Sequence, residues 1–249
     1  MTEPLVHLDV ADGVATITLD SQRNRNALSK QLVTELSEHL ATADVDDAVR
    51  AVVVAAAGPV FCAGADMAEA AEGGMEQGAR GLVALQRQIV ALAKPVVVRL
   101  QGPVRAGGLG IVGAADIVIA ADTVTFAFTE VRLALAPAVI SLTTLPRLTD
   151  RAAALSYLGG ATFDATEAAR IGLVTQAVAA GSLDAAVEAV LAELRKGSPQ
   201  GLRETKALLN QGLLGRIDAL GESVSVRSAR LFGSDEAHEA MTAFLNRKR

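Results

Sequence analysis

The sequence predicts a mixed α/β fold that is followed by a helical C-terminal region. Short, strongly apolar runs alternate with longer segments in which apolar residues recur at helical spacing. The runs at 49–56 and 96–100 are typical of strands that are covered on both faces. From residue 141 onward the signals are mostly helical. We therefore expect an α/β core over residues 1–190 and a helical region over residues 191–249.

The N-terminal third begins with a predicted β-hairpin. Apolar and polar residues alternate over 6–10 and again over 15–19, and Asp12-Gly13 lies between the two runs. An Asp-Gly pair between alternating runs is a strong hairpin signal. Leucines and a valine at helical spacing then predict a helix within 28–40.

The central part alternates between predicted helices and strands. Residues 86–92 continue a helix, and Lys94-Pro95 ends it because the residue before a proline disfavours helical geometry. A short helix is expected over 108–114, with strands over 117–120 and 123–128. These elements complete the predicted core together with a last short strand at 173–178.

Helix boundary signals dominate the C-terminal part. Asp164 to Glu167 resembles a capping box, and Gly172 resembles the stop of that helix. Ser198-Pro199 is typical of an N-cap followed by proline in the first helical position. Asp235 and Glu236 after Ser234 place acidic residues at the positive end of a final helix.

Composition limits the classes of function. The chain has 249 residues, of which 51% are hydrophobic, and a net charge of -5, so disorder and a basic nucleic-acid surface are not expected. No apolar run approaches the length of a membrane span, and the first ten residues lack a signal-peptide pattern. A single cysteine, Cys62, fits a reducing compartment. We expect a cytoplasmic protein with no membrane or nucleic-acid partner, and no metal because the three histidines lack ligand spacing.

An internal repeat links two parts of the predicted core. A valine run, a Gly-Pro-Val turn and a small-residue corner occur twice, 44 residues apart and without a gap: Val52–Val54, Gly58–Val60 and Ala63-Gly64, then Val96–Val98, Gly102–Val104 and Gly107-Gly108. If the repeat were only two copies of a structural turn, this would explain the Gly-Pro pairs but not the small residues that follow both of them. Two small-residue corners side by side would instead aim the N–H groups of Ala63 and Gly107 at one oxygen. Preorganised donors of this kind stabilise an oxygen that gains negative charge.

Five segments resemble the enoyl-CoA hydratase/isomerase (crotonase) superfamily. They are GPVFCAGAD at 58–66, QGPVRAGGLG at 101–110, NAL at 26–28, TEV at 129–131 with Leu133 and Pro137, and MTAFL at 241–245. The resemblance spans nearly the whole chain and implies a crotonase-type spiral of repeated ββα units with a C-terminal helical trimerisation region. It also implies a homotrimer or hexamer that acts on an acyl-CoA thioester, without a cofactor because coenzyme A is part of the substrate.

The resemblance also implies roles for individual residues. The thioester oxygen would lie between the N–H groups of Ala63 and Gly107, with Glu130 as the catalytic acid and base. The expected substrate and CoA contacts are Arg23, Asn24, Gly64, Ala65, Asp66, Gly108 and Phe244. Phe244, with Arg247 or Lys248, would close the site from a neighbouring subunit, and the alternative for this segment is a helix with an apolar stripe and a solvated basic end.

One departure from the family pattern concerns the second glutamate that such hydratases carry. Gly110 occupies the position of this second glutamate, so Glu130 has no carboxylate partner in the motif. A loop that carried Glu69, Glu72 or Glu76 into the site would supply a replacement. Phe126 and Phe128 provide an apolar setting that predicts a raised pKa for Glu130. We expect an enoyl-CoA hydratase that adds water across the 2,3 double bond through an enolate. The alternatives are an enoyl-CoA isomerase that uses one glutamate and an acyl-CoA-binding homologue with little catalysis.

Overall fold

The computed structural model describes residues 3–66, 69 and 75–246, and the side chains of residues 244–246 lie outside this description. Within these residues a six-stranded sheet has the order β1-β2-β3-β4-β6-β9, and a three-stranded sheet has the order β5-β7-β8. The strands are β1 Val6–Ala11, β2 Val14–Leu19, β3 Ala51–Ala56, β4 Val96–Leu100, β5 Val104–Arg105, β6 Ile117–Ala121, β7 Thr125–Ala127, β8 Phe163–Asp164 and β9 Gln176–Val178. The predicted mixed α/β fold is confirmed.

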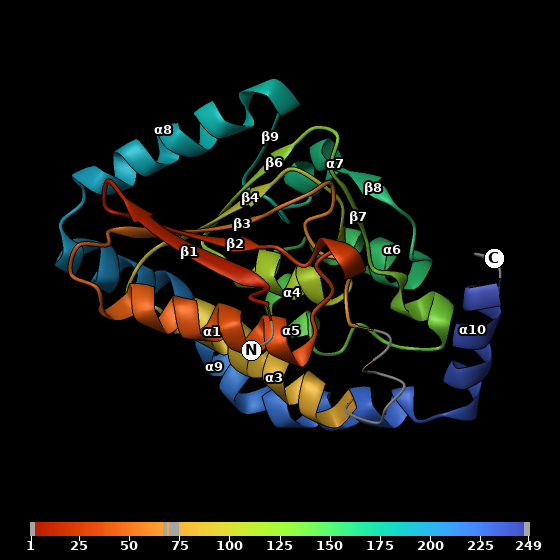
Figure 1. Ribbon diagram of the computed structural model, residues 1–249. Coiled ribbons are helices and arrows are strands. Elements are labelled where there is room, and N and C mark those ends of the chain that lie inside the picture. Colours follow the sequence, from red (N-terminus) through yellow and green to blue (C-terminus); the bar gives the residue numbers. More distant parts are fainter. Residues whose placement is uncertain (1–2, 67–68, 70–74, 247–249) are drawn as a thin grey trace.

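Helices cover both faces of the larger sheet (Figure 1). They are α1 Lys30–Val45, α3 Met75–Ala91, α4 Gly107–Ala114, α5 Ser141–Thr144, α6 Asp150–Gly159, α7 Ala165–Arg170, α8 Leu183–Lys196, α9 Pro199–Phe232 and α10 Asp235–Asn246, with short 3-10 helices η1 Gln22–Asn24, η2 Thr129–Leu133 and η3 Ala180–Ser182. Helix α8 lies on one face of the sheet, and α1, α3 and α9 lie on the other. Helix α1 packs directly on β1 and β2, whereas α4 and α5 lie between the strands and the helices α3 and α9. No described helix is long and apolar enough to cross a membrane.

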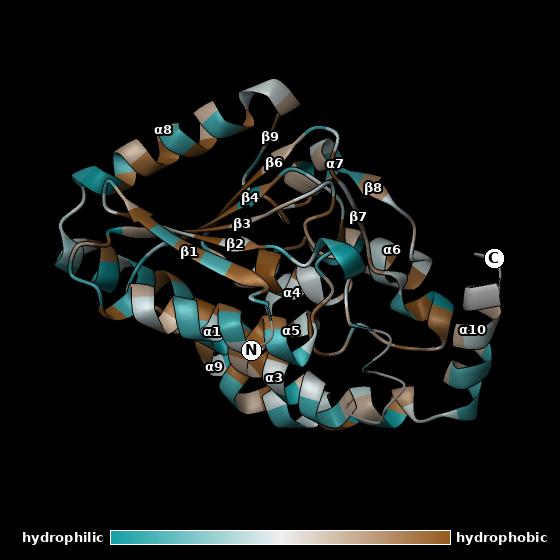
Figure 2. Cartoon of the chain, in the orientation of Figure 1, coloured by the Kyte–Doolittle hydropathy of each residue, from teal (hydrophilic) through white to brown (hydrophobic). Residues whose placement is uncertain are grey.

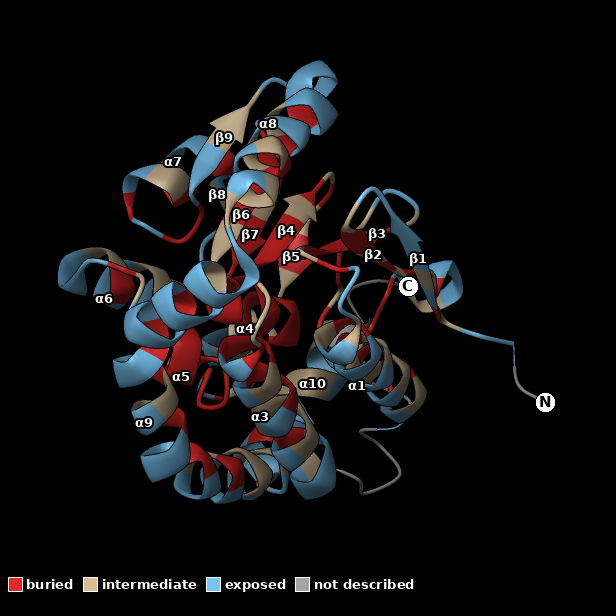
Figure 3. Ribbon diagram, turned by 90° about the vertical axis from the view of Figure 1, so that its left-hand side faces the viewer, coloured by how far each residue is buried: buried red, intermediate tan, exposed pale blue. Residues whose placement is uncertain are grey.

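The central strands form the core because their side chains are apolar on both faces. All six residues of β3 are buried, and β4 is buried except at Arg99. Figure 2 shows these strands and α4 in the hydrophobic colour, whereas α1 and α9 carry hydrophilic residues. Figure 3 shows the same strands, with α4 and α5, as the buried centre of the molecule. The two faces of the sheet are thus both covered, as the valine runs predicted.

The predicted hairpin and N-caps are confirmed, although the Glu167 carboxylate bonds Arg170 and does not complete the capping box. Asp12 and Gly13 have φ of 49° and 76° and join the antiparallel strands β1 and β2. Asp164 accepts a hydrogen bond from the N–H of Glu167 at the start of α7, and Ser198 accepts one from the N–H of Gly201 at the start of α9. These side chains satisfy helix N–H groups that have no partner within the helix.

Some boundaries differ from the prediction. Helix α3 spans Met75–Ala91, so the predicted helical residues 86–92 cover only its C-terminal part. The bounds of its first turns were not predicted, because Gly78 and Gly81 weaken the helical signal there. Strands β7 and β9 are shorter than their apolar runs, at three residues each. The predicted division at residue 190 falls inside α8, and the region after it consists of α9 and α10. This division stays a prediction.

Candidate active site

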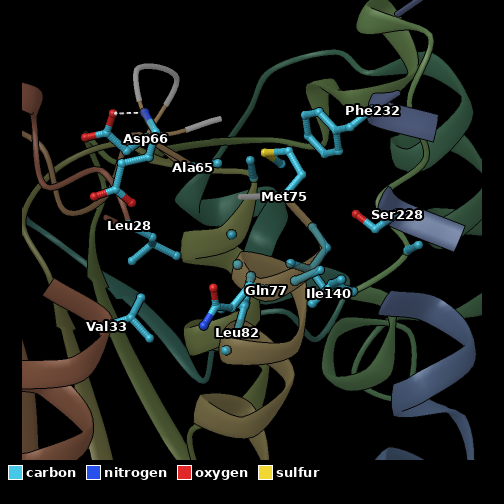
Figure 4. Close-up of a pocket in the computed structure, with 18 of the residues that line it drawn as sticks. Leu28, Val33, Ala65, Asp66, Met75, Gln77, Leu82, Ile140, Ser228 and Phe232 are labelled. Carbon is cyan, nitrogen blue, oxygen red and sulfur yellow. Dashed lines mark hydrogen bonds between the residues drawn. The ribbon is translucent and has the colours of Figure 1, made fainter. Parts of the chain in front are cut away.

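A cavity of about 610 Å³ lies between α1, α3, α9 and η2 (Figure 4). Its volume falls in the range of small-molecule sites in proteins. Leu28 and Val33 form one side, and Ser228 and Phe232 of α9 form the opposite side. The cavity brings together three residues from the sequence prediction, Ala65, Gly107 and Glu130, and a fourth, Asp66, at its edge. It is therefore the candidate site.

Glu130 supplies a largely buried carboxyl group to this cavity. The residue lies in η2, and its Oε2 has no hydrogen-bond partner among the described residues. Burial raises the pKa of Glu130 from its ordinary 4.5 to about 7. Phe128, which precedes η2, packs against Tyr157 with the two rings tilted and their centroids 4.4 Å apart. The predicted apolar environment is confirmed, although a short helix and not a strand end presents the side chain.

Gly107 places a free backbone donor at the cavity wall. It is the first residue of α4, and its N–H therefore has no partner within the helix. Ala106 precedes it with φ of 45°, a conformation that non-glycine residues adopt rarely. A Cβ on Gly107 would lie 2.7 Å from Leu28 Cδ1, so a larger residue here would require the Leu28 side chain to move. The positive end of α4 adds to the attraction of this donor for a negative oxygen.

The first predicted donor, Ala63, requires a correction. Its N–H donates to the carbonyl oxygen of Arg25 at 3.1 Å, and the residue does not line the cavity. Ala65, two residues further on, does line it, and the N–H of Ala65 donates to no residue that the structure describes. Ala65 pairs with Leu28 in an isolated parallel bridge that uses the Gly64 carbonyl and not this N–H. The available donors at the cavity are thus those of Ala65 and Gly107.

Gly64 and Gly108 pack behind the donors and do not line the cavity. The N–H of Gly64 lies 3.5 Å from Cys62 Sγ, and the N–H of Gly108 also points to this sulfur. A Cβ on Gly108 would lie 2.7 Å from Cys62 Cβ. Burial raises the pKa of Cys62 to about 12, so the thiol stays protonated and packs as a small apolar group. The expected substrate contacts of both glycines stay predictions.

Two of the predicted CoA residues, Asn24 and Asp66, meet at one edge of the cavity. Asn24 Nδ2 donates to Asp66 Oδ2 at 2.8 Å, which ties η1 to the cavity edge, whereas Arg23 is exposed and does not line the cavity. Glu69 Oε2 accepts from the N–H of Lys30 at 2.8 Å, so this carboxylate holds the start of α1. The Phe244 side chain, Glu72, Arg247 and Lys248 lie outside the described residues. Glu76 pairs with Arg80 on the same helix.

Sequence reasoning missed Gln86, a fully buried polar residue of α3 behind Gly110. A Cβ on Gly110 would lie 3.1 Å from Gln86 Oε1. Gln86 lies four residues after Leu82 and three before Ile89, which both belong to the apolar face of α3. A polar residue on an apolar helix face is the signal that would have revealed it.

A mixed α/β fold whose cavity holds one unpaired acid and two free backbone donors defines an acid–base site for a small molecule. A family model described as enoyl-CoA hydratase/isomerase matches residues 9–249. The chain belongs to this family. The crystal structure of an enoyl-CoA hydratase from Mycobacterium avium superposes with a TM-score of 0.93 at 47% identity, over 99% of this chain and 98% of that chain. The predicted crotonase-type fold is confirmed by this match.

Relatives with different acyl groups match the chain about equally well. A short-chain-enoyl-CoA hydratase of Clostridium acetobutylicum is 28% identical over 98% of this chain and 95% of its own length. A mevalonyl-coenzyme A hydratase of Aspergillus fumigatus is 29% identical over 95% of this chain and 90% of its own length. Sequence similarity to these relatives therefore does not indicate which acyl group this chain accepts. No set of three or more His, Cys, Asp or Glu suited to a metal ion occurs in the part of the chain that the structure describes.

Proposed function

We propose that the protein is an enoyl-CoA hydratase that adds water to the 2,3 double bond of a 2-enoyl-CoA thioester. The observation that carries this proposal is the Glu130 carboxyl, unpaired at Oε2 among the described residues and facing a cavity with the free donors of Ala65 and Gly107. Because its pKa is raised to about 7, this group can both accept and return a proton near neutral pH. The 47% identical hydratase structure supports the same reaction class.

The mechanism follows from these groups. The carboxylate of Glu130 takes a proton from water as the water oxygen bonds to C3, and the electron pair of the double bond moves through C2 toward the thioester carbonyl. The resulting enolate oxygen accepts hydrogen bonds from the N–H groups of Ala65 and Gly107. Glu130 then returns the proton to C2, so that one water has been added. Each donor of this kind contributes about 3 kcal/mol of transition-state stabilisation.

Isomerisation of 3-enoyl-CoA to 2-enoyl-CoA is the second candidate. The observation in its favour is the lack of a side chain at Gly110, which leaves Glu130 without a second carboxylate from α4. Removing a proton from C2 and returning it to C4 needs one base and no bound water. The same enolate and the same two donors would serve this reaction.

The remaining assignments also belong to this proposal. Coenzyme A would enter at the edge formed by Lys30, Asp66 and Glu69, with Arg23 and Asn24 of η1 nearby. A homotrimer or hexamer is proposed from the family resemblance of the C-terminal region, with Phe244 of a neighbouring subunit at the site. The proposed compartment is the cytoplasm, because a chain with one cysteine forms no intrachain disulfide.

Product analysis by mass tests the proposed function. The protein is incubated separately with 2-enoyl-CoA and 3-enoyl-CoA thioesters. A gain of one water supports hydration, and a double-bond shift without mass change supports isomerisation in its place. Glu130→Gln should lower either rate by at least about a hundredfold, because it removes the only proposed base. Glu38→Gln is the matched control, since Glu38 is exposed on α1. Full activity of Glu130→Gln would contradict the mechanism.

A further inference from the structure

The contacts of Gln86 give it a place behind the proposed reaction site. Its side chain is fully buried on α3, and each polar atom has a partner. Oε1 accepts from Thr143 Oγ1 at 2.7 Å, and Nε2 donates to the carbonyl oxygens of Leu82 at 3.2 Å and Val139 at 3.4 Å. Gln86 thus joins α3 to the segment that contains Val139 and to α5. A buried amide with all its partners fixes the elements that it connects.

The segment that Gln86 holds is part of the cavity wall. Ala136, Pro137, Ala138, Val139 and Ile140 all line the cavity that contains Glu130 and Gly107. The bond from Gln86 Nε2 to the Val139 carbonyl therefore acts on the wall from behind, since Gln86 itself is not a lining residue. A shift of this wall would change the position of a bound acyl group relative to Glu130.

Gln86 also fills the space next to Gly110. A Cβ on Gly110 would lie 3.0 Å from Gln86 Cδ, 3.1 Å from its Oε1 and 3.1 Å from Ile140 Cγ2. These distances are tighter than ordinary carbon contacts, and a side chain longer than one carbon would need the volume that the carboxamide occupies. Glycine at 110 and glutamine at 86 are therefore complementary in shape.

We propose that Gln86 is a positioning and specificity-determining residue, which holds the Ala136–Ile140 wall and prevents α4 from presenting a second side chain to the site. The reaction is thereby restricted to a single acid–base group, Glu130. This inference rests on the proposed function, because it concerns how many carboxylates take part in that reaction. The steric part of it can be tested without substrate.

Four proteins test the steric part by their unfolding midpoints: wild type, Gln86→Ala, Gly110→Glu and the double variant. Gly110→Glu alone should unfold at a lower temperature than wild type, because the introduced carboxylate side chain and Gln86 compete for one volume. The double variant should unfold above Gly110→Glu, although Gln86→Ala alone is destabilising. If Gly110→Glu is as stable as wild type, or if Gln86→Ala lowers the midpoint of Gly110→Glu further, the inference is overturned.

The pH dependence of kcat tests the specificity part. Wild type should show one ionisation near pH 7, that of Glu130. The double variant should show two ionisations and a higher ratio of hydration to isomerisation, because two neighbouring carboxylates titrate as a coupled pair. A folded double variant with one ionisation and an unchanged product ratio would overturn this part. Absence of turnover in wild type, with the stability coupling intact, would instead overturn the proposed function.

Gln86→Leu tests the positioning role and does not depend on the double variant. Leucine keeps most of the volume but leaves the Val139 carbonyl and the Thr143 hydroxyl without this partner. The KM for the acyl-CoA thioester should rise about threefold to tenfold, the effect of one or two lost hydrogen bonds, with a smaller change in kcat. Gln88→Leu is the matched control, since Gln88 is on the same helix but bonds to Ser37 of α1. Equal KM values for Gln86→Leu and wild type would contradict the role.

Discussion

The N–H of Ala63 donates to the carbonyl oxygen of Arg25 at 3.1 Å. This bond fastens the corner after β3 to the loop that carries Arg25 and Asn26, both of which have left-handed backbone angles. Asn26 strengthens the same junction, because its Nδ2 donates to the carbonyl oxygens of Ala57 and Val60. The N–H of Ala63 is therefore used in a structural bond, and the segment after β3 first lines the cavity at Ala65.

Replacing single backbone N–H groups by ester oxygens separates the two alanines. An ester at Ala65 should lower kcat by about a hundredfold to a thousandfold, because one donor to the enolate oxygen is lost. An ester at Ala63 should lower the free energy of unfolding by about 1 kcal/mol and leave kcat within a factor of about three. Semisynthetic proteins with each change are compared by turnover and by urea unfolding. If the ester at Ala63 lowered kcat and the ester at Ala65 did not, Ala63 would be the donor to the enolate oxygen.

The repeat explains why the sequence predicted Ala63, and not the cavity residue Ala65, as the counterpart of Gly107. Strands β3 and β4 pair Val52 with Val96, which keeps the spacing of 44 residues seen in the sequence. The corners pair Cys62 with Val104, a spacing of 42. At this second spacing Gly107 corresponds to Ala65. The spacing between paired residues thus changes from 44 in the strands to 42 at the corners. A comparison of the two repeat sequences without gaps does not reveal this change, because it arises from the backbone pairing.

The activity of the protein should rise with pH through about 7. Glu130 acts as a base only when ionised, and burial raises its pKa from 4.5 to about 7. The rate should therefore be low at pH 5 and reach a plateau near pH 8. A pH profile of kcat, measured on the preferred substrate, checks this expectation. A rate that is constant from pH 5 to pH 8 would show that Glu130 is already ionised at pH 5.

The same pKa makes Glu130 costly for folding at high pH. The folded protein holds the proton more tightly than the unfolded chain, so this contribution is fully present below pH 4.5 and is lost as the pH rises to about 7. Above pH 7, Glu130→Gln should be more stable than wild type by about 1 to 3 kcal/mol. Urea unfolding at pH 5 and pH 8 measures the difference. If Glu130→Gln exceeded wild type in stability by the same amount at both pH values, the raised pKa of Glu130 would be contradicted.

A buried cation should fix the N-terminal part of α9 against the C-terminal end of α3. Lys206 Nζ contacts Asp116 Oδ2 at 2.8 Å and donates to the carbonyl oxygens of Ile89 and Lys94, each at 2.9 Å. Lys206→Met should destabilise the protein by about 3 to 5 kcal/mol, because Asp116 loses its charged partner in the interior. The control Lys196→Met removes an exposed pair with Glu193 and should cost less than about 1 kcal/mol. Thermal unfolding of both variants provides the comparison.

The position of Glu130 was predictable and the shape of the cavity was not. The phenylalanines at 126 and 128 lie next to Glu130 in sequence, so its apolar environment follows from local residues. Gln86, Ser228 and Phe232 reach the site or its wall from helices far away in the chain. Their contribution depends on how α3 and α9 pack, which a single sequence does not state. The acyl group that the site prefers depends on this wall, so it is predicted from the structure and not from the sequence.

Substrates with an uncharged hydrocarbon chain longer than four carbons should be preferred. Among the described residues, the charged lining residues other than Glu130 are Lys30, Asp66 and Glu69, and hydrogen bonds link Glu69 to the other two at one edge. Away from that edge the wall is mainly apolar and ends at Phe232 of α9. Each buried methylene stabilises the complex by about 0.8 kcal/mol, or about fourfold in affinity. A chain that carries a carboxylate would lose its hydration there without a partner.

Kinetics with 2-enoyl-CoA thioesters of four and eight carbons measure this preference. The eight-carbon thioester should have a kcat/KM at least about tenfold higher than the four-carbon one. Phe232→Ala should reduce that ratio about threefold or more, since it removes apolar surface from the end of the cavity. Leu231→Ala is the matched control, because Leu231 is adjacent on α9 but does not line the cavity, and it should keep the ratio. A wild-type preference for four carbons, or an equal effect of both variants, would show that the chain does not extend toward Phe232.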